Sequence, residues 1–432
     1  MNKKSESLNI SYFPYWWEAA EPKPAIHDLP SGTQDVVIVG AGYTGLSAAL
    51  TLAKSGLSVV VLDTQLPGFG ASSRNGGMIS NLLKPGLSGL MAKYGIERGE
   101  AIYRESLNSV DFVKKLVGDE EIECDLNLKG RLYPAVLEKH LDAMKKETAL
   151  KQKHLGIEDE IIGKGQCQED IASDLYVGGF RQFDTGGLHP AKFVEGLASA
   201  VEKNGGLILA PCTAKAIKKK SGTYLIDTSL GTINCDKVVI ATNGYSGGVY
   251  PSLEKKVIPI GSTMIATEKL SKEMVSSLFP TGRMIADSRK MLSYFRPSPD
   301  GTRVLLGGRP TVLPSTPDVQ ARALQKRLAD IFPQLRDVAV SHVWTGNVAY
   351  SFDALPAIGH DEGIYFALGY CGSGVAMSGY LGHKVALKIL KSSEGDTAFD
   401  GLPFESKAYY QGQPWFLPIA MAGYKLRDTF GF

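Results

Sequence analysis

The stretch from Asp35 to Asp63, DVVIVGAGYTGLSAALTLAKSGLSVVVLD, constrains the fold of this chain more than any other. Val36 to Val39 form a β-branched run typical of a buried parallel strand, and a glycine-rich turn interrupts the run. Val59 to Leu62 predict a second such strand. Between the two strands, helical spacing places four apolar residues on one face, and Gly56 ends the helix; the four are Leu46, Ala49, Leu50 and Ala53. The stretch therefore predicts a right-handed βαβ unit.

The glycines of GAGYTG are spaced as in dinucleotide-binding turns. Gly40 would make the tight turn, Gly42 would let a pyrophosphate approach the backbone, and Gly45 would let the helix lie close to the strand. Asp63 ends the second strand, where a carboxylate can accept hydrogen bonds from ribose hydroxyls. The alternative is an ordinary α/β unit with an incidental glycine turn. The strand, helix, second strand and acid in register favour the dinucleotide interpretation.

Composition limits the class of protein. A chain of 432 residues predicts two or more lobes, and a net charge of +2 argues against nucleic acid as a partner. The five cysteines are scattered without a CxxC pair, which argues against a metal site and indicates a reducing compartment. The polar N-terminus is not typical of a signal peptide, and no stretch predicts a transmembrane segment. The sequence therefore predicts a soluble, cytoplasmic protein that binds no metal.

A second glycine-rich segment follows the acid directly, from Gly68 to Met78. Its composition suits a loop whose backbone touches a ligand. Ser72 and Ser73 could donate hydrogen bonds to a pyrophosphate, and Arg74 could place a cation near it. The alternative is a surface loop, but the position directly after Asp63 favours the ligand.

The two motifs together resemble the FAD-dependent amine and amino-acid oxidase superfamily, which includes D-amino acid oxidase, sarcosine oxidase and glycine oxidase. The segments RNGG, at 74–77, and SYFPYWWEAA, at 11–20, are most similar to the gamma-glutamylputrescine oxidase branch. The resemblance implies an α/β fold in which a Rossmann-type FAD-binding domain is interleaved with an α+β substrate domain that contains a mainly antiparallel sheet.

The resemblance implies the following domain limits. An extended arm (1–34) precedes a discontinuous FAD-binding domain (35–90, 160–248 and 335–400), the substrate domain comprises 91–159 and 249–334, and a tail follows at 401–432. Proline-rich sequence and aromatic residues predict that the arm is pinned to the surface. We expect the apolar tail to dock on the body of the protein; contact with a membrane surface is the alternative.

The resemblance also implies which residues contact FAD. Those expected to do so are Gly40, Gly42, Tyr43, Thr44, Gly45, Asp63, Thr64, Gly70, Ala71, Ser72, Ser73, Arg74, Asn75, Gly76, Gly77, Met78, Ala214, Ala241, Thr242, Asn243, Gly244, Gly369, Gly372, Ser373, Gly374 and Val375. The histidine and cysteine that bond flavin covalently in some relatives have no counterpart at 72–74 or 344–359, so we expect non-covalent FAD. The strand at 304–307 lacks the lysine that assists oxygen in sarcosine oxidase.

No second GxGxxG follows a predicted strand, so the electrons are expected to come from an organic substrate instead of a nicotinamide. A helix beginning near Gly374 would stabilise negative charge on the flavin. Arg296 with Tyr294 is the candidate for binding a substrate carboxylate; the alternative is a surface arginine before a proline turn. Tyr350, Tyr370 and Met78 are candidates for pocket walls. His189 is expected to be a loop or cap residue, not a catalytic base.

These expectations combine into an FAD-dependent oxidoreductase that oxidises a C–N bond of an amine or N-substituted amino acid to an imine by hydride transfer to flavin N5. Hydrolysis then gives an aldehyde or oxo acid, with oxygen as the expected acceptor and hydrogen peroxide as its product. One alternative is a dehydrogenase that passes electrons to a carrier. Another is a non-catalytic, flavin-bound assembly protein.

Overall fold

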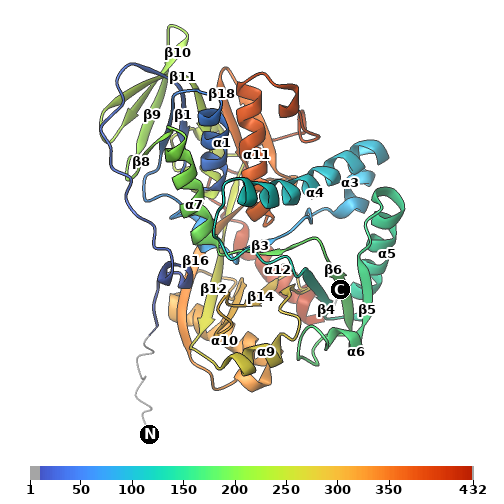
Figure 1. Ribbon diagram of the computed structural model, residues 1–432. Helices are drawn as coiled ribbons and strands as arrows, with labels where there is room; N and C mark the ends of the chain where they lie inside the picture. Colours follow the sequence, from blue (N-terminus) through green and yellow to red (C-terminus); the bar gives the residue numbers. More distant parts are fainter. Residues whose placement is uncertain (1–9, 431–432) are drawn as a thin grey trace.

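The predicted βαβ unit forms the centre of the first lobe. In the computed structural model, which describes residues 10–430, β1 (Thr33–Val39) leads through a turn into α1 (Tyr43–Lys54) and then β2 (Val59–Leu62). β1 and β2 are parallel, with Val36 paired with Val59 and Val39 with Leu62. Figure 1 shows this unit in blue in the upper lobe.

The first sheet extends from this unit on both sides. Its strand order is β17-β18-β11-β1-β2-β8, with a β9–β10 hairpin attached to β11. β1, β2, β8, β11 and β18 run parallel. The added strands are β8 (Leu207–Leu209), β9 (Ala214–Lys220), β10 (Thr223–Thr228), β11 (Thr232–Ile240), β17 (Ala357–Asp361) and β18 (Ile364–Leu368). β8 pairs in parallel with β2, and β9 and β10 form an antiparallel hairpin.

The two faces of the first sheet are buried in separate cores, because successive strand residues point to opposite faces. Val36 and Ile38 pack in one core with helices, whereas Val37 and Val39 pack with the β9–β10 side. The helices that contribute to the first core include α1, α3 (Gly86–Tyr94), α4 (Ile96–Asp119), α7 (Pro190–Lys203) and α11 (Gly374–Ile389). Burial on both faces explains the continuous apolar runs of β1 and β2.

The second lobe is built on a mainly antiparallel sheet, as expected. Its order is β16-β12-β15-β14-β13-β4-β6-β5, and only the β13–β4 pair is parallel. The strands are β4 (Arg131–Ala135), β5 (Glu160–Gly163), β6 (Gly178–Gln182), β12 (Ile258–Thr267), β13 (Met284–Ala286), β14 (Ser293–Pro297), β15 (Val304–Gly308) and β16 (Val340–Tyr350). Its helices are α5 (Glu138–Leu155), α6 (Lys164–Cys167), α9 (Lys272–Leu278) and α10 (Pro317–Ile331). Two short elements, β3 (Met78–Ile79) and β7 (Gly186–Gly187), pair with each other between the lobes, and α3 (Gly86–Tyr94) packs on α4.

Three predicted domain limits are wrong. The expected FAD-binding domain includes the segments that contain β5, β6 and β16, but these strands hydrogen-bond within the second sheet. Conversely, the expected substrate domain includes α4, but the apolar face of this helix packs in the first core with α1 and α11. Strand pairing and helix packing between distant segments decide these memberships, and neither is visible in local sequence.

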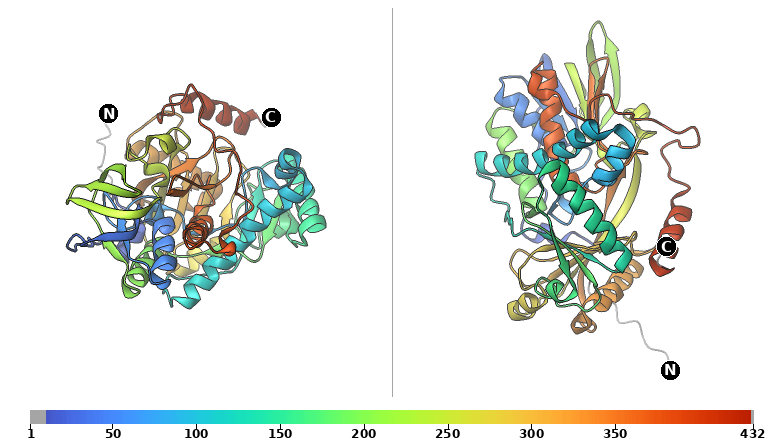
Figure 2. Two further views of the ribbon diagram at one scale, coloured as in Figure 1. Left: turned by 90° about the horizontal axis from the view of Figure 1, so that it is seen from above. Right: turned by 90° about the vertical axis from the view of Figure 1, so that its right-hand side faces the viewer.

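The two ends of the chain cross the surface of the body. The arm forms a 3-10 turn, η1 (Tyr15–Glu18), with Trp16 fully buried; residues 1–9 of the predicted arm lie outside the described residues. At the other end, α12 (Leu417–Phe430) lies beside the second lobe, and Figure 2 shows its course. The Asp428 carboxylate accepts hydrogen bonds from the backbone N–H groups of Lys290 and Met291 at 2.7 Å, so the tail docks on the body as expected. Within 10–430, no helix has the length and apolar character needed to cross a membrane.

Candidate cofactor and active site

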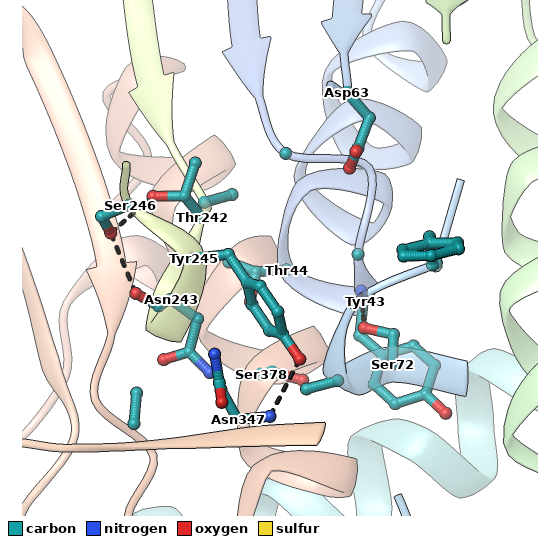
Figure 3. Close-up of a pocket in the computed structure, with 18 of the residues that line it drawn as sticks. Tyr43, Thr44, Asp63, Ser72, Thr242, Asn243, Tyr245, Ser246, Asn347 and Ser378 are labelled. Carbon is teal, nitrogen blue, oxygen red and sulfur yellow. Dashed lines mark hydrogen bonds between the residues drawn. The ribbon is translucent and has the colours of Figure 1, made fainter. Parts of the chain in front are cut away.

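A cavity of about 480 Å³ opens where the parallel strands of the first sheet end. Ligands bind at the carboxyl ends of the strands in open α/β sheets, because the loops that follow them converge there. The turn after β1, Asp63 after β2 and the 241–249 segment after β11 all line the cavity, and β16 of the second sheet closes its far side. Figure 3 shows Asp63 and Asn347 on opposite sides of this space.

Asp63 is held at one end of the cavity by the backbone. Its Oδ2 accepts from the N–H of Ala41 at 2.8 Å and its Oδ1 accepts from the N–H of Gln65 at 2.9 Å. Burial raises the pKa of Asp63, and the two backbone N–H groups act in the opposite direction. The carboxylate is therefore fixed in orientation and can still accept hydrogen bonds from ligand hydroxyls.

The glycine turn has no room for side chains. A Cβ on Gly45 would lie 1.8 Å from the carbonyl oxygen of Gly40, so α1 could not lie against β1. A Cβ on Gly42 would lie 2.8 Å from Oγ of Ser72, which accepts from the N–H of Tyr43 at 3.1 Å. The N-terminus of α1 thus faces the cavity without obstruction, the arrangement that suits a bound pyrophosphate.

The opposite end of the cavity lies against β16 and the N-terminus of α11. Tyr245 Oη accepts from the N–H of Asn347 at 2.9 Å, which joins the segment after β11 to the second sheet. Tyr370 and Cys371 precede α11 and line the same end. Tyr370 Oη lies 2.6 Å from Oγ1 of Thr44 and donates to the carbonyl of Ala367. Burial raises the pKa of Tyr370, so its phenol is neutral at physiological pH.

Cys371 is also held in its neutral form. Its Sγ donates to the carbonyl of Gly369 at 3.0 Å, and burial raises the pKa of its thiol to about 11. Tyr370 and Cys371 are therefore neither bases nor nucleophiles near neutral pH.

Most of the predicted cofactor residues meet at this cavity. Those that line it are Gly40, Gly42, Tyr43, Thr44, Asp63, Thr64, Gly70, Ala71, Ser72, Asn75, Ala214, Ala241, Thr242, Asn243, Gly372, Gly374 and Val375, together with Tyr370. Gly45, Ser73, Arg74, Gly76, Gly77, Met78, Gly244, Gly369 and Ser373 lie outside this lining. The sequence interpretation missed lining residues such as Phe69, Cys212, Thr213, Tyr245, Ser246, Asn347, Val348, Cys371 and Ser378. Position directly after a strand could have identified Cys212 and Thr213, whereas β16 reaches the cavity only through tertiary packing.

Arg74 does not face the cavity as a free cation. Its Nε donates to the carbonyl of Phe69 at 2.8 Å, and its guanidinium lies over the rings of Trp17 and Phe69, at 4.9 and 4.6 Å from their centroids. The adjacent Ser73 is fully buried and accepts a hydrogen bond from Trp17. The predicted contacts of Arg74 and Ser73 with a pyrophosphate are therefore wrong, because both side chains point toward the arm.

Arg296 and Tyr294, both on β14, contact the 74–77 loop. Nη1 of Arg296 donates to the carbonyls of Leu188 at 2.9 Å, Gly77 at 3.2 Å and Gly76 at 3.4 Å. The side chain is fully buried, and this burial lowers its pKa to about 10. Tyr294 lies under Gly76, where a Cβ would meet its ring at 3.0 Å, and its Oη lies 3.0 Å from Oγ of Ser262. The prediction that Arg296 offers a free fork to a substrate carboxylate is therefore wrong.

The remaining wall candidates lie in different settings. Tyr350 forms a β-bridge with Tyr370, and its Oη lies 3.8 Å from the point that a Cβ on Gly372 would occupy, so it borders the α11 end of the cavity. Met78 follows the 74–77 loop and is not among the residues that line the cavity; its Sδ is 3.7 Å from Nη2 of Arg131. His189 is the N-cap of α7: its Nδ1 accepts from the N–H of Lys192, and burial lowers its pKa to about 4, which confirms a cap role.

The comparison with known families agrees with this geometry. Residues 35–387 match the family described as FAD dependent oxidoreductase. The chain belongs to this family. Its cofactor is FAD, and the cavity fits that group because it combines an open glycine turn at a helix N-terminus with an oriented carboxylate.

Individual relatives of this FAD-dependent oxidoreductase are similar over nearly their whole length. Gamma-glutamylputrescine oxidoreductase of Escherichia coli (strain K12) is 31% identical over 92% of this chain and 94% of its own. Glycine oxidase from Geobacillus kaustophilus has the same fold, with a TM-score of 0.72 at 21% identity, over 88% of this chain and 99% of its own. L-proline dehydrogenase from P. horikoshii has a TM-score of 0.69 at 20% identity, over 91% of this chain and 99% of its own. The predicted FAD-oxidoreductase family and fold are confirmed.

Proposed function

We propose that the protein oxidises a C–N bond of an amine or N-substituted amino acid similar to gamma-glutamylputrescine. The carbon next to nitrogen loses a hydride and the nitrogen loses a proton, which leaves an imine. Water then hydrolyses the imine to an aldehyde or oxo acid and a free amine. FAD, when bound, accepts the two electrons. Oxygen as the final acceptor would take them on with two protons, giving hydrogen peroxide.

The observation that carries this proposal is the α11 end of the cavity. The N-terminus of α11 favours negative charge there, and β16 of the second lobe supplies Asn347 and Val348 as walls. Tyr370 and Cys371 are neutral, so neither removes a proton from the substrate amine. In this proposal the amine arrives in its neutral form, and the wall residues act by orienting its C–H bond.

Arg309 replaces Arg296 as our candidate for binding a substrate carboxylate. It follows β15 directly, is half-buried, and its Cζ lies 5.3 Å from the centroid of the Tyr350 ring. Within residues 10–430 no carboxylate lies within ion-pair distance of it. Gamma-glutamylputrescine carries a free carboxylate on its glutamyl end, which a guanidinium fork could bind in bidentate fashion. Tyr350 would fix the position of that fork by lying under it.

Arg309→Met is expected to raise KM for gamma-glutamylputrescine roughly 10- to 100-fold while leaving FAD content unchanged, because a charge-assisted pair of hydrogen bonds is lost. Steady-state kinetics with gamma-glutamylputrescine and with putrescine, which has no carboxylate, measures the effect. The control variant is Arg322→Met, an exposed arginine on α10. An equal rise in KM for both amines, or none for either, would contradict a carboxylate contact.

The direct test of the proposed function is an anaerobic titration of the yellow holoprotein with gamma-glutamylputrescine, putrescine, sarcosine and a panel of amino acids. Loss of the flavin absorption at about 450 nm would identify the reducing substrate. Subsequent admission of air separates the two acceptors: rapid return of colour with formation of peroxide supports an oxidase. If no amine bleaches the flavin, the proposal fails and a non-catalytic, flavin-bound assembly role is favoured.

A dehydrogenase that passes electrons to a carrier is the second candidate. Two observations favour it: the fold is shared with L-proline dehydrogenase, and β15 has only Val, Leu and Gly at 304–308, without a lysine. We also propose non-covalent attachment of FAD and a reducing, cytoplasmic location. The five cysteines support both, because all are buried as free thiols and the thiol of Cys371, at the cavity, is neutral.

A further inference from the structure

Three of the four tryptophans in the chain donate their indole N–H to the same short loop. Trp17 Nε1 donates to Oγ of Ser73 at 2.9 Å, and Trp16 Nε1 donates to the carbonyl of Asn75 at 2.8 Å. Trp344, on β16, donates to the carbonyl of Arg74, also at 2.8 Å. Two of the three belong to the N-terminal arm, which precedes the first strand of the FAD-binding sheet.

Besides the three tryptophans, Arg296 of β14 and the side chain of Asn75 hold the 74–77 loop in its conformation. Arg296 donates to the carbonyls of Gly76 and Gly77, so all four carbonyls of residues 74–77 are bonded by another element. The Asn75 side chain donates to the carbonyls of Ala71 and Ser72 and accepts from the N–H of Gly77. Because Ser72 and Asn75 line the cavity, the shape of the loop fixes part of the cofactor site.

The arm also reaches the cavity by a second route. Trp17 lies on one side of the Arg74 guanidinium and packs against Phe69 with a centroid distance of 5.4 Å. Phe69 lines the cavity directly. Trp16 packs edge-on against His189 and lies 5.5 Å from the Arg296 guanidinium, so the group that bonds Gly76 and Gly77 rests on the arm as well.

We propose that Trp16 and Trp17 of the N-terminal arm are positioning residues of the FAD site, and that docking of the arm and binding of FAD are thermodynamically coupled. An undocked arm leaves the carbonyl of Asn75 and the hydroxyl of Ser73 without their donors, so the 73–77 loop loses its fixed shape. Coupling between two binding events is reciprocal: whatever the docked arm adds to FAD affinity, bound FAD adds to arm docking. The proposal depends on FAD as cofactor and not on the identity of the substrate.

The first test is the rate of FAD release from diluted holoprotein, followed by the increase in flavin fluorescence. Trp16→Phe keeps the aromatic ring and removes the N–H donor, and is expected to speed release about 5- to 10-fold; Trp17→Phe is expected to act in the same direction. The matched control is Trp415→Phe, because exposed Trp415 donates its N–H to the carbonyl of Tyr409, remote from the loop. Release from Trp16→Phe and Trp17→Phe at the control rate would overturn the proposal.

The reciprocal test uses the unmodified protein, so it does not depend on the folding of a variant. Chymotrypsin is added to FAD-loaded and FAD-stripped protein, and the N-terminal fragments are measured by mass spectrometry. FAD is expected to slow cleavage after Trp16 and Trp17 several-fold, while cleavage after Tyr409, exposed in the tail, proceeds at the same rate. Equal cleavage of the arm with and without FAD would show that arm and cofactor are uncoupled.

Discussion

Replacing Gly45 by alanine is expected to lower the free energy of unfolding by about 3 kcal/mol or more and to leave the protein without FAD. The new Cβ would lie 1.8 Å from the Gly40 carbonyl oxygen and 3.2 Å from Cγ2 of Ile38. Both neighbours belong to the strand and turn at the centre of the first sheet, so α1 would have to move away. Its N-terminus would then no longer face the cavity.

Chemical denaturation and the ratio of flavin to protein absorbance measure the two effects. Gly118→Ala is the matched control, because Gly118 lies inside α4 and an added Cβ would meet no atom within 4 Å. It is expected to raise stability by up to about 1 kcal/mol, since alanine favours the helix. A Gly45→Ala protein as stable and as yellow as the control would show that α1 does not need this close approach.

Asp63→Ala is expected to weaken FAD binding about 100-fold. The carboxylate that would accept from ribose hydroxyls is lost, and the N–H groups of Ala41 and Gln65 lose the acceptor that orders the turn. Hydrogen bonds to a charged group contribute about 1.5–3 kcal/mol each, and about 1.4 kcal/mol is tenfold in affinity. Titration of the apoprotein with FAD measures the change. Asp63→Asn keeps an oxygen acceptor, so its FAD affinity is expected to lie between those of the unmodified protein and Asp63→Ala.

Asp35→Ala separates this effect from a general loss of stability. Asp35 lies at the other end of β1, and its Oδ2 accepts from both the N–H and Oγ of Ser58 at 2.7 Å. Asp35→Ala removes the two hydrogen bonds from Ser58, as Asp63→Ala removes those from Ala41 and Gln65, but it does so far from the cavity. FAD affinity is therefore expected to stay unchanged. If Asp35→Ala and Asp63→Ala weaken FAD binding equally, Asp63 has no specific place in the cofactor site.

The elements that sequence predicted well are those whose signals are local. β1, α1 and β2 follow from apolar spacing and from glycines that interrupt it. Asp63 could be placed because the acid directly ends a buried strand, so its position relative to the glycine turn is fixed by parallel pairing within one βαβ unit.

The errors concern side chains whose partners are far away in the sequence. Arg296 looked like a substrate ligand because it lies at a strand end next to Tyr294, yet its guanidinium bonds carbonyls that are 108 to 220 residues away. Arg74 looked like a phosphate ligand because it lies in a glycine-rich loop, yet it turns toward the aromatic rings of the arm. Local pattern indicates that an arginine is present but not which way it points.

Local sequence is sufficient to specify the FAD-binding unit, because glycine geometry, strand burial and an acid at a strand end are properties of residues close together in the chain. Long-range packing determines which segments form the second sheet, places β16 at the far side of the cavity, and brings the arm against the 73–77 loop. These depend on hydrogen bonds and packing between segments hundreds of residues apart. Such contacts depend on the free energy of the whole fold, so they cannot be predicted from the pattern of neighbouring residues.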